Sequence, residues 1–118
     1  MNLIEVTFDD GALPVEGYGP GFFRVGGKVF DGPVLITPFA ARSWGGLADR
    51  AALMALAGQA DVLFLGMGAE IAHAPADLRK ALEAAGLGVE VMASPPAART
   101  YNVLLSEGRR IAAALLPV

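Results

Sequence analysis

The stretch Asp61-Val62-Leu63-Phe64-Leu65-Gly66-Met67-Gly68 decides the fold. A short, continuously apolar run that ends in glycine is typical of a strand buried on both faces of a parallel sheet. Similar runs occur at residues 34–37, 89–92 and 110–116, and helical patterns lie at about 48–57, 75–85 and 95–107. This alternation predicts an α/β fold of three layers, with a mixed, mostly parallel central sheet flanked by helices.

The ends and faces of the helices carry further signals. Pro75 and Gly86 bracket the second helix, and Ser94 is expected to cap the third, with Pro95 at its first position. The first helix has no polar side over residues 51–57. A helix that is apolar all round is usually buried all round, so it either packs inside one subunit or forms part of a protein interface.

The first 32 residues are rich in glycine and alternate like strands. Residues 3–8 read as a strand, residues 9–11 as a turn, and residues 22–30 as a hairpin closed by Gly26-Gly27. These residues predict an antiparallel β layer against the central sheet. The alternative is a doubly wound sheet in which the N-terminal strands merely extend one edge. In both cases residues 1–118 are expected to form a single domain.

Composition excludes several classes of protein. The 118-residue chain is 54% hydrophobic and has no cysteine, one histidine and a net charge of −3. Disulfide scaffolds, cysteine nucleophiles, zinc ribbons and iron–sulfur ligation are therefore excluded, and no basic stripe for nucleic acid is present. No catalytic residue, metal or cofactor is expected. The apolar window at residues 51–69 is broken by glycine and Asp61, so we expect a cytoplasmic protein with no integral membrane segment.

A candidate ligand cleft follows from the predicted parallel strands. Ligands collect beyond the carboxyl ends of such strands, where helix N-termini present free amides. Three loops qualify, at residues 38–44, 66–70 and 93–100, and the residues they could bring together around a small anion are Arg42, Trp44, Gly66, Gly68, Arg99 and Thr100. Tight turns between strand and helix are the simpler explanation of the glycines. Asn102 forms a polar stripe with Arg99 and Ser106, which suits either a structural or an anion-contacting role.

Several motifs together resemble a known family. They include residues 17–21, 23–25, 61–68, 88–92, 99–102 and 107–110, with Trp44 and Leu78-Arg79 between them. From about residue 15 to the C-terminus they resemble, in the same order, the Mth-nine-three-eight domain family of unknown function, which includes the mitochondrial complex I alpha-subcomplex assembly factor.

The resemblance implies a compact three-layer fold with a central mixed sheet. It also implies action through protein binding, because the assembly-factor relatives bind proteins while the membrane enzyme is built. One departure matters: several family members have a cysteine before the Arg-Thr-Tyr-Asn run, where this chain has Ala98. Thiol chemistry proposed for the family is therefore excluded here.

Two functions remain open at this point. The first is a non-catalytic protein-interaction or assembly module, linked through the resemblance to respiratory complex I. The second is a small-anion or small-molecule binding protein or enzyme that uses the cleft near Arg99. Because residues 51–57 and 111–116 lack polar faces, we also expect a homodimer or a stable complex with another protein.

Overall fold

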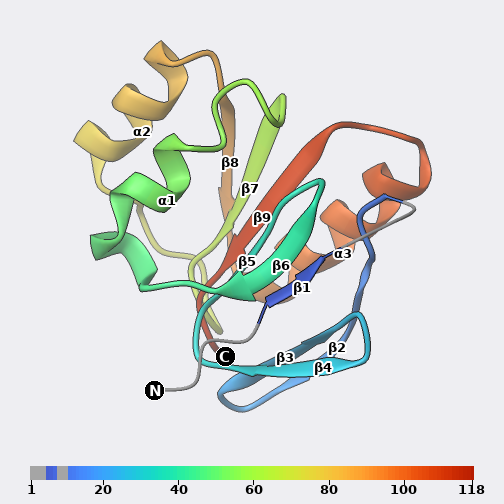
Figure 1. The fold of residues 1–118 in the computed structure, drawn as a ribbon. Helices are drawn as coiled ribbons and strands as arrows, with labels where there is room; N and C mark the ends of the chain where they lie inside the picture. The colour runs from blue at the N-terminus through green and yellow to red at the C-terminus, as the bar shows by residue number, and fades with distance from the viewer. Residues whose placement is uncertain (1–4, 8–10) are drawn as a thin grey trace.

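A computed structural model describes residues 5–7 and 11–118 and contains two sheets (Figure 1). The larger has six strands in the order β1-β6-β5-β9-β7-β8, and the smaller has three in the order β2-β3-β4. The strands are β1 (Glu5–Thr7), β2 (Val15–Gly19), β3 (Phe22–Val25), β4 (Lys28–Asp31), β5 (Val34–Ile36), β6 (Ala40–Ser43), β7 (Val62–Gly66), β8 (Gly88–Met92) and β9 (Ile111–Leu115).

The helices cover both faces of the larger sheet, as predicted. They are η1 (Gly46–Ala48), α1 (Arg50–Met54), α2 (Ala76–Ala84) and α3 (Ser94–Ser106). Figure 1 shows α1 and α2 on one side of the sheet, with α3 and the small sheet on the other. The three-layer α/β architecture is therefore confirmed, and α2 and α3 lie within a residue or two of their predicted bounds.

Side chains of the central strands alternate between two hydrophobic cores. Leu63 and Leu65 point to the core under α1 and α2, whereas Phe64 between them joins the core under α3 and the small sheet. On β9, Ala112 and Ala114 face the first core and Ala113 faces the second. Successive side chains of a strand point to opposite faces, so a strand at the centre of three layers must be apolar throughout.

The sheet is mixed, but it has fewer parallel pairings than we predicted. Only β9-β7 and β7-β8 are parallel, and the other three pairs are antiparallel. The difference arises at residues 38–44, predicted as a loop, because residues 40–43 form β6. The Thr37 hydroxyl oxygen accepts hydrogen bonds from the amides of Phe39 and Ala40, and Thr37 N–H donates to the Ala40 carbonyl at 2.8 Å. This turn reverses the chain and pairs β6 antiparallel to β5.

The N-terminal region combines the two predicted arrangements: most of it forms a separate antiparallel layer, and one strand extends the edge of the larger sheet. Strands β2, β3 and β4 form the expected antiparallel layer, and Gly26 and Gly27 adopt positive φ in the hairpin turn. Strand β1 instead pairs with β6 at the edge of the larger sheet. The remainder of the predicted strand at residues 3–8, and residues 9 and 10 of the predicted turn, lie outside the described residues.

The first helix is shorter and more exposed than its sequence suggests. It covers five residues, after a single 3-10 turn, instead of residues 48–57. Ala52 and Leu53 are buried, but Met54 is 39% exposed and Ala51 and Ala55 are also exposed. The helix is therefore not buried all round. An exposed salt bridge links it to α2, with Arg50 Nη1 2.6 Å from Asp77 Oδ2, and this hydrogen bond lowers the pKa of Asp77.

The buried side chain of Tyr101 allows the packing of the core under α3 to be tested by substitution. Its ring is fully buried, and its hydroxyl has no hydrogen-bond partner in the described part of the chain. Burial raises the pKa of Tyr101, so the group stays neutral. An unpaired buried hydroxyl is destabilising, and we expect Tyr101→Phe to raise the free energy of unfolding by about 1 kcal/mol in urea titrations. Tyr101→Ala, which also empties the ring's volume, should lower it by about 3 kcal/mol or more. A destabilised Tyr101→Phe variant would show that the hydroxyl has a partner.

Candidate functional site

The carboxyl ends of the parallel strands meet at Ser94, which is fully buried. Its hydroxyl accepts a hydrogen bond from Gly68 N–H at 2.9 Å and donates one to the Leu116 carbonyl at 2.6 Å. Its own amide donates to the Gly68 carbonyl at 2.7 Å. One side chain thus joins the segments that follow β7 and β9 to the first turn of α3.

Two glycines are required for this arrangement. A Cβ on Gly66 would lie 2.7 Å from Ser94 Oγ and 2.8 Å from Ser94 Cα, which no neighbouring atom can relieve without moving backbone. Gly68 has a φ of +102°, and a Cβ there would lie 3.2 Å from the Pro117 carbonyl oxygen. Close packing therefore accounts for both glycines.

The expected capping role of Ser94 is wrong. Ala93 occupies the N-cap position of α3 with an extended backbone, and Ser94 is the first helical residue. The Ser94 hydroxyl is directed to the strand ends instead of the helix amides.

Arg42 and Trp44 lie apart from these strand ends. Trp44 is only 4% exposed, packs in the core under α1 and α2, and donates its indole N–H to the Asp49 carbonyl at 3.2 Å. Arg42 is the cross-strand partner of Leu35, which belongs to the same core, and it lines an opening beside α1. Both side chains are therefore on the α1 and α2 side of the sheet.

The other predicted polar residues lie on α3, on the opposite face. Arg99 is exposed and Thr100 is half-buried. Asn102 Oδ1 accepts a hydrogen bond from Val15 N–H at 2.8 Å, and Asn102 Nδ2 donates to the Val15 carbonyl at 3.0 Å. The amide of Asn102 thus pairs with both backbone groups of Val15, as a neighbouring strand would, and fastens β2 to α3.

The seven residues proposed from the sequence do not surround one space. Gly66 and Gly68 lie at the closed strand ends, Arg42 and Trp44 lie on one face of the sheet, and the α3 residues lie on the other. Anion binding at Arg99 stays a prediction, and it would have to occur on the exposed surface of α3.

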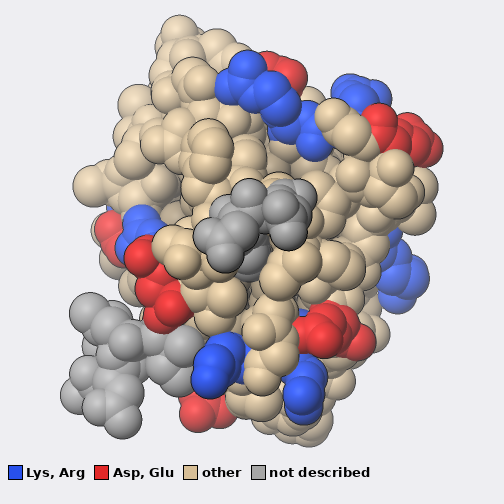
Figure 2. Space-filling view, turned by 45° about the vertical axis from the view of Figure 1, so that its right-hand side comes forward, with Lys and Arg blue, Asp and Glu red and all other residues tan. Residues whose placement is uncertain are grey.

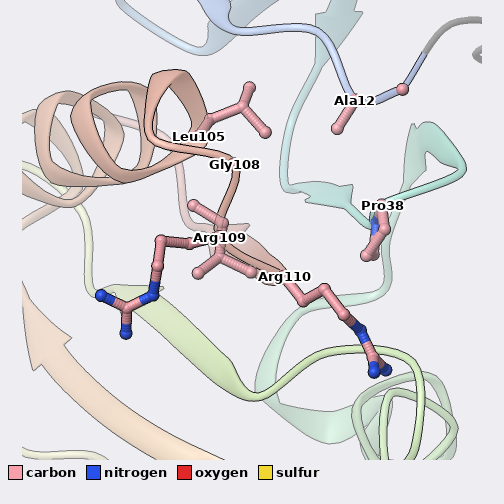
Figure 3. Close-up of a pocket in the computed structure, with 8 residues that line it drawn as sticks. Ala12, Pro38, Leu105, Gly108, Arg109 and Arg110 are labelled. Carbon is pink, nitrogen blue, oxygen red and sulfur yellow. The ribbon is translucent and has the colours of Figure 1, made fainter.

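Described residues away from the strand ends line two openings. The larger, of about 290 Å³, is bounded by the C-terminal end of α3, the start of β9 and the segments around Ala12 and Pro38. Figure 3 shows the guanidinium groups of Arg109 and Arg110 extending in different directions, neither of them toward Ala12. Arg110 donates a hydrogen bond from Nη2 to the Gly58 carbonyl at 2.7 Å. These cations therefore do not converge on a common ligand position.

The smaller opening, of about 190 Å³, lies between α1 and the β5-β6 turn, and we name it the α1 groove. Its walls are largely apolar, with Arg42, Glu5, Thr37 and Gln59 as polar members. The apolar residues are Leu35, Phe39, Ala40, Ala52, Ala55 and Leu56. Phe39 is 61% exposed, so a phenyl ring stands at this groove largely in water.

Charge does not mark a binding face on the side of the molecule that Figure 2 draws. On the side of the molecule drawn in Figure 2, Lys and Arg form small separate groups interspersed with Asp and Glu, not a continuous band. This distribution does not favour a polyanion as ligand.

The sequence reasoning missed Phe39 and, although it considered a structural role for Asn102, did not identify the partner of Asn102. The residue types around Phe39 contain a usable signal, since Thr37-Pro38 before an aromatic residue is a turn pattern and a turn tip is exposed. No local signal identifies Asn102 as a partner of Val15, because the two residues are 87 positions apart.

A family profile described as "Protein of unknown function (DUF498/DUF598)" matches residues 15–116. The chain belongs to this family. A solved Mth938-like domain from Bordetella pertussis has 30% sequence identity and a TM-score of 0.75, with 89% of this chain and 85% of that one covered. The resemblance to the Mth-nine-three-eight domain family is thereby confirmed.

Of two similar proteins, one has a name without a function and the other is named as an assembly factor. An uncharacterized protein of Rhodobacter capsulatus is 60% identical over 108 residues, covering 92% of this chain and 87% of that protein. A Danio rerio protein named NADH dehydrogenase [ubiquinone] 1 alpha subcomplex assembly factor 3 is 33% identical over 110 residues, covering 87% of this chain. The chain matches 63% of that protein's length. The family thus has distant similarity to a complex I assembly factor.

Ser94→Ala should be among the more destabilising single-atom deletions in the chain. It leaves Gly68 N–H and the Leu116 carbonyl without their partner in a buried position, at a cost of about 1–3 kcal/mol for each group. Chemical denaturation should therefore show a loss of about 2 kcal/mol or more. Ser106→Ala is the matched control, because the Ser106 hydroxyl is exposed and bonds only within its own helix. Equal stabilities of the two variants would contradict the bridging role.

Asn102→Ala tests the connection between α3 and β2. Because Val15 is buried, losing the amide leaves both of its backbone groups poorly paired, and we expect a loss of about 1–2 kcal/mol. Amide exchange at Val15 should accelerate in the same variant. Arg99→Ala, one turn earlier and exposed, should change stability by less than about 0.5 kcal/mol. The reverse order of the two effects would show that the polar stripe is held by Arg99 instead.

Proposed function

We propose that this chain is a non-catalytic protein-interaction module that uses the α1 groove and Phe39 to hold a partner during assembly. The single observation that carries the proposal is the exposed phenyl ring at an apolar groove. Exposed aromatic residues next to an apolar pocket are typical of the anchors that dominate protein interfaces.

The surroundings of Phe39 extend this apolar area. The exposed Ala55, which directly follows α1, lines the groove, and Ala51 and Met54 of α1 are exposed as well. The first helix, which is apolar in sequence, therefore contributes exposed apolar side chains to the surface. The other apolar run, residues 111–115, is completely buried as the central strand β9. Only the first of the two runs therefore supports association.

The dimensions of the groove favour a protein partner over a small ligand. Sites for small molecules usually enclose about 300–1,000 Å³ and bury most of the ligand. The α1 groove, at about 190 Å³, suits one side chain of a partner. Arg42 and its cross-strand partner Glu5 both line the groove, so its polar rim carries charges of both signs.

The relatives suggest which partners to examine first. By similarity to the assembly factor of Danio rerio, we propose components of respiratory complex I, with another assembly factor or a second copy of this chain as further possibilities. A cytoplasmic location also stays a prediction. Among the described residues no helix is long and apolar enough to cross a membrane.

The test compares Phe39→Ser with Ile71→Ser in co-purification from the native host, with complex I subunits quantified by mass spectrometry. Ile71 is 75% exposed and does not line the groove, so it controls for the loss of an exposed apolar side chain. We expect parent and Ile71→Ser to recover the same complex I subunits and Phe39→Ser to recover about tenfold less, the usual effect of losing an anchor worth 1.4 kcal/mol or more. Equal recovery with Phe39→Ser, or no complex I subunit with the parent, would overturn the proposal.

A further inference from the structure

The larger opening and the α1 groove lie on either side of the same turn of the chain. Pro38 lines the larger opening, and the residues before and after Pro38 line the α1 groove. The two openings are linked a second time through Arg110, which lines the larger one and donates a hydrogen bond to the Gly58 carbonyl. The next residue, Gln59, lines the α1 groove. The openings are therefore adjacent, and the β5-β6 turn forms the ridge between them.

The larger opening, like the α1 groove, has apolar walls. Its lining consists of glycine, apolar residues and two arginines. Figure 3 shows the Leu105 side chain of α3 pointing across the opening toward Ala12, with Pro38 on the same side as Ala12. Two apolar hollows separated by one turn suit two apolar side chains of a single partner, because the centre of a protein interface is usually apolar.

The charges at the two openings are mostly positive. Arg109 and Arg110 are the ionisable residues that line the larger opening, and no described acidic residue lines it. Arg109 is exposed, and among the described residues it forms no ion pair. The α1 groove adds Arg42 and Glu5. Three arginines and a single glutamate thus surround the β5-β6 turn in the described part of a chain whose net charge is −3.

The arrangement of these cations favours a polypeptide with carboxylates over other anions. The guanidinium groups of Arg109 and Arg110 extend in different directions, so one small anion cannot meet both (Figure 3). Separate Asp or Glu side chains of a partner can, and arginine pairs well with carboxylates. The apolar walls disfavour a nucleic acid, because its backbone has no apolar side chain to place between them.

We propose that the partner held at the α1 groove extends over the β5-β6 turn into the larger opening, where it places an apolar residue flanked by Asp or Glu. This inference rests on the function proposed above, because it names the chemistry of the same partner. It adds Arg109 and the C-terminal end of α3 to the interface, on the far side of the turn from the groove.

Site-specific photo-cross-linking in the native host tests the extent of the interface. The photoreactive residue p-benzoylphenylalanine replaces Phe39 at the α1 groove, Ala12 at the larger opening, or Ile71, which is exposed and lines neither. We expect positions 39 and 12 to cross-link to the same partner protein, and position 71 not to do so. Mass spectrometry should find Asp or Glu beside the residue that cross-links to position 12.

Arg109→Gln tests the charge at the larger opening. Arg99→Gln is the matched control, since Arg99 is also exposed but lines neither opening. Co-purification of the cross-linked partner, quantified by mass spectrometry, should fall about fivefold or more with Arg109→Gln and stay unchanged with Arg99→Gln. The parent should lose more of the partner than Arg109→Gln does when the salt concentration is raised, because salt screens exposed charges.

The outcomes separate this inference from the proposed function. Cross-linking at position 39 alone, or to different proteins at positions 39 and 12, would overturn the inference and leave the proposed function in place. No partner at either position would overturn both. A second copy of this chain at position 12, or a partner segment without Asp or Glu, would also contradict the inference. Should the variant at position 12 not fold, the two arginine variants decide alone: equal co-purification with Arg109→Gln and Arg99→Gln would overturn it.

Discussion

The buried hydroxyl of Ser94 is the constraint on which the arrangement of the layers depends. It bonds at once to the segment after β7 and to the segment after β9, and it is carried by the first turn of α3. A buried donor and acceptor must each be paired, so the two strand ends and the helix can only move together. Gly66 leaves the room that Ser94 needs, and any side chain at that position would push α3 from the sheet. The place where a doubly wound sheet usually opens for a ligand is therefore occupied by the protein itself.

Side chains complete the hydrogen bonding of the backbone at three further places. Thr37 closes the turn before β6, Asn102 takes the place of a strand beside Val15, and Arg79 covers a carbonyl of β8. Each lies where regular pairing stops, at a chain reversal or at a sheet edge. A short chain that forms two sheets has many such ends relative to its size. These three polar residues pair backbone groups at the ends of regular pairing in the small sheet, the β5-β6 hairpin and the edge strand β8.

Local patterns were sufficient for the parts of the fold that local patterns control. The apolar run at residues 62–65 and the spacing of Leu78 and Leu82 predicted β7 and α2 correctly, because burial on two faces or on one side requires those residue types. The hairpin of β5 and β6 was missed because the polar pair Arg42-Ser43 does not look like a strand, and its pairing is set by a turn three residues long. The candidate cleft was drawn from the assumption that β6 was a loop. Once residues 40–43 join the sheet, Arg42 and Arg99 lie on opposite faces of it.

Phe39 is a residue whose side chain is not explained by the fold. The turn that carries it is held by the backbone and hydroxyl of Thr37, and these bonds use only the main-chain groups of residues 39 and 40. A polar residue at position 39 could make the same bonds, so the turn does not require the phenyl ring. With 61% of its surface in water, the ring also contributes little burial to the core. Its neighbours in the α1 groove include the exposed apolar side of α1, which folding likewise leaves unused. An aromatic residue that the turn does not require, placed against apolar surface that the core does not cover, gains most from contact with another molecule, which would bury the exposed part of its ring.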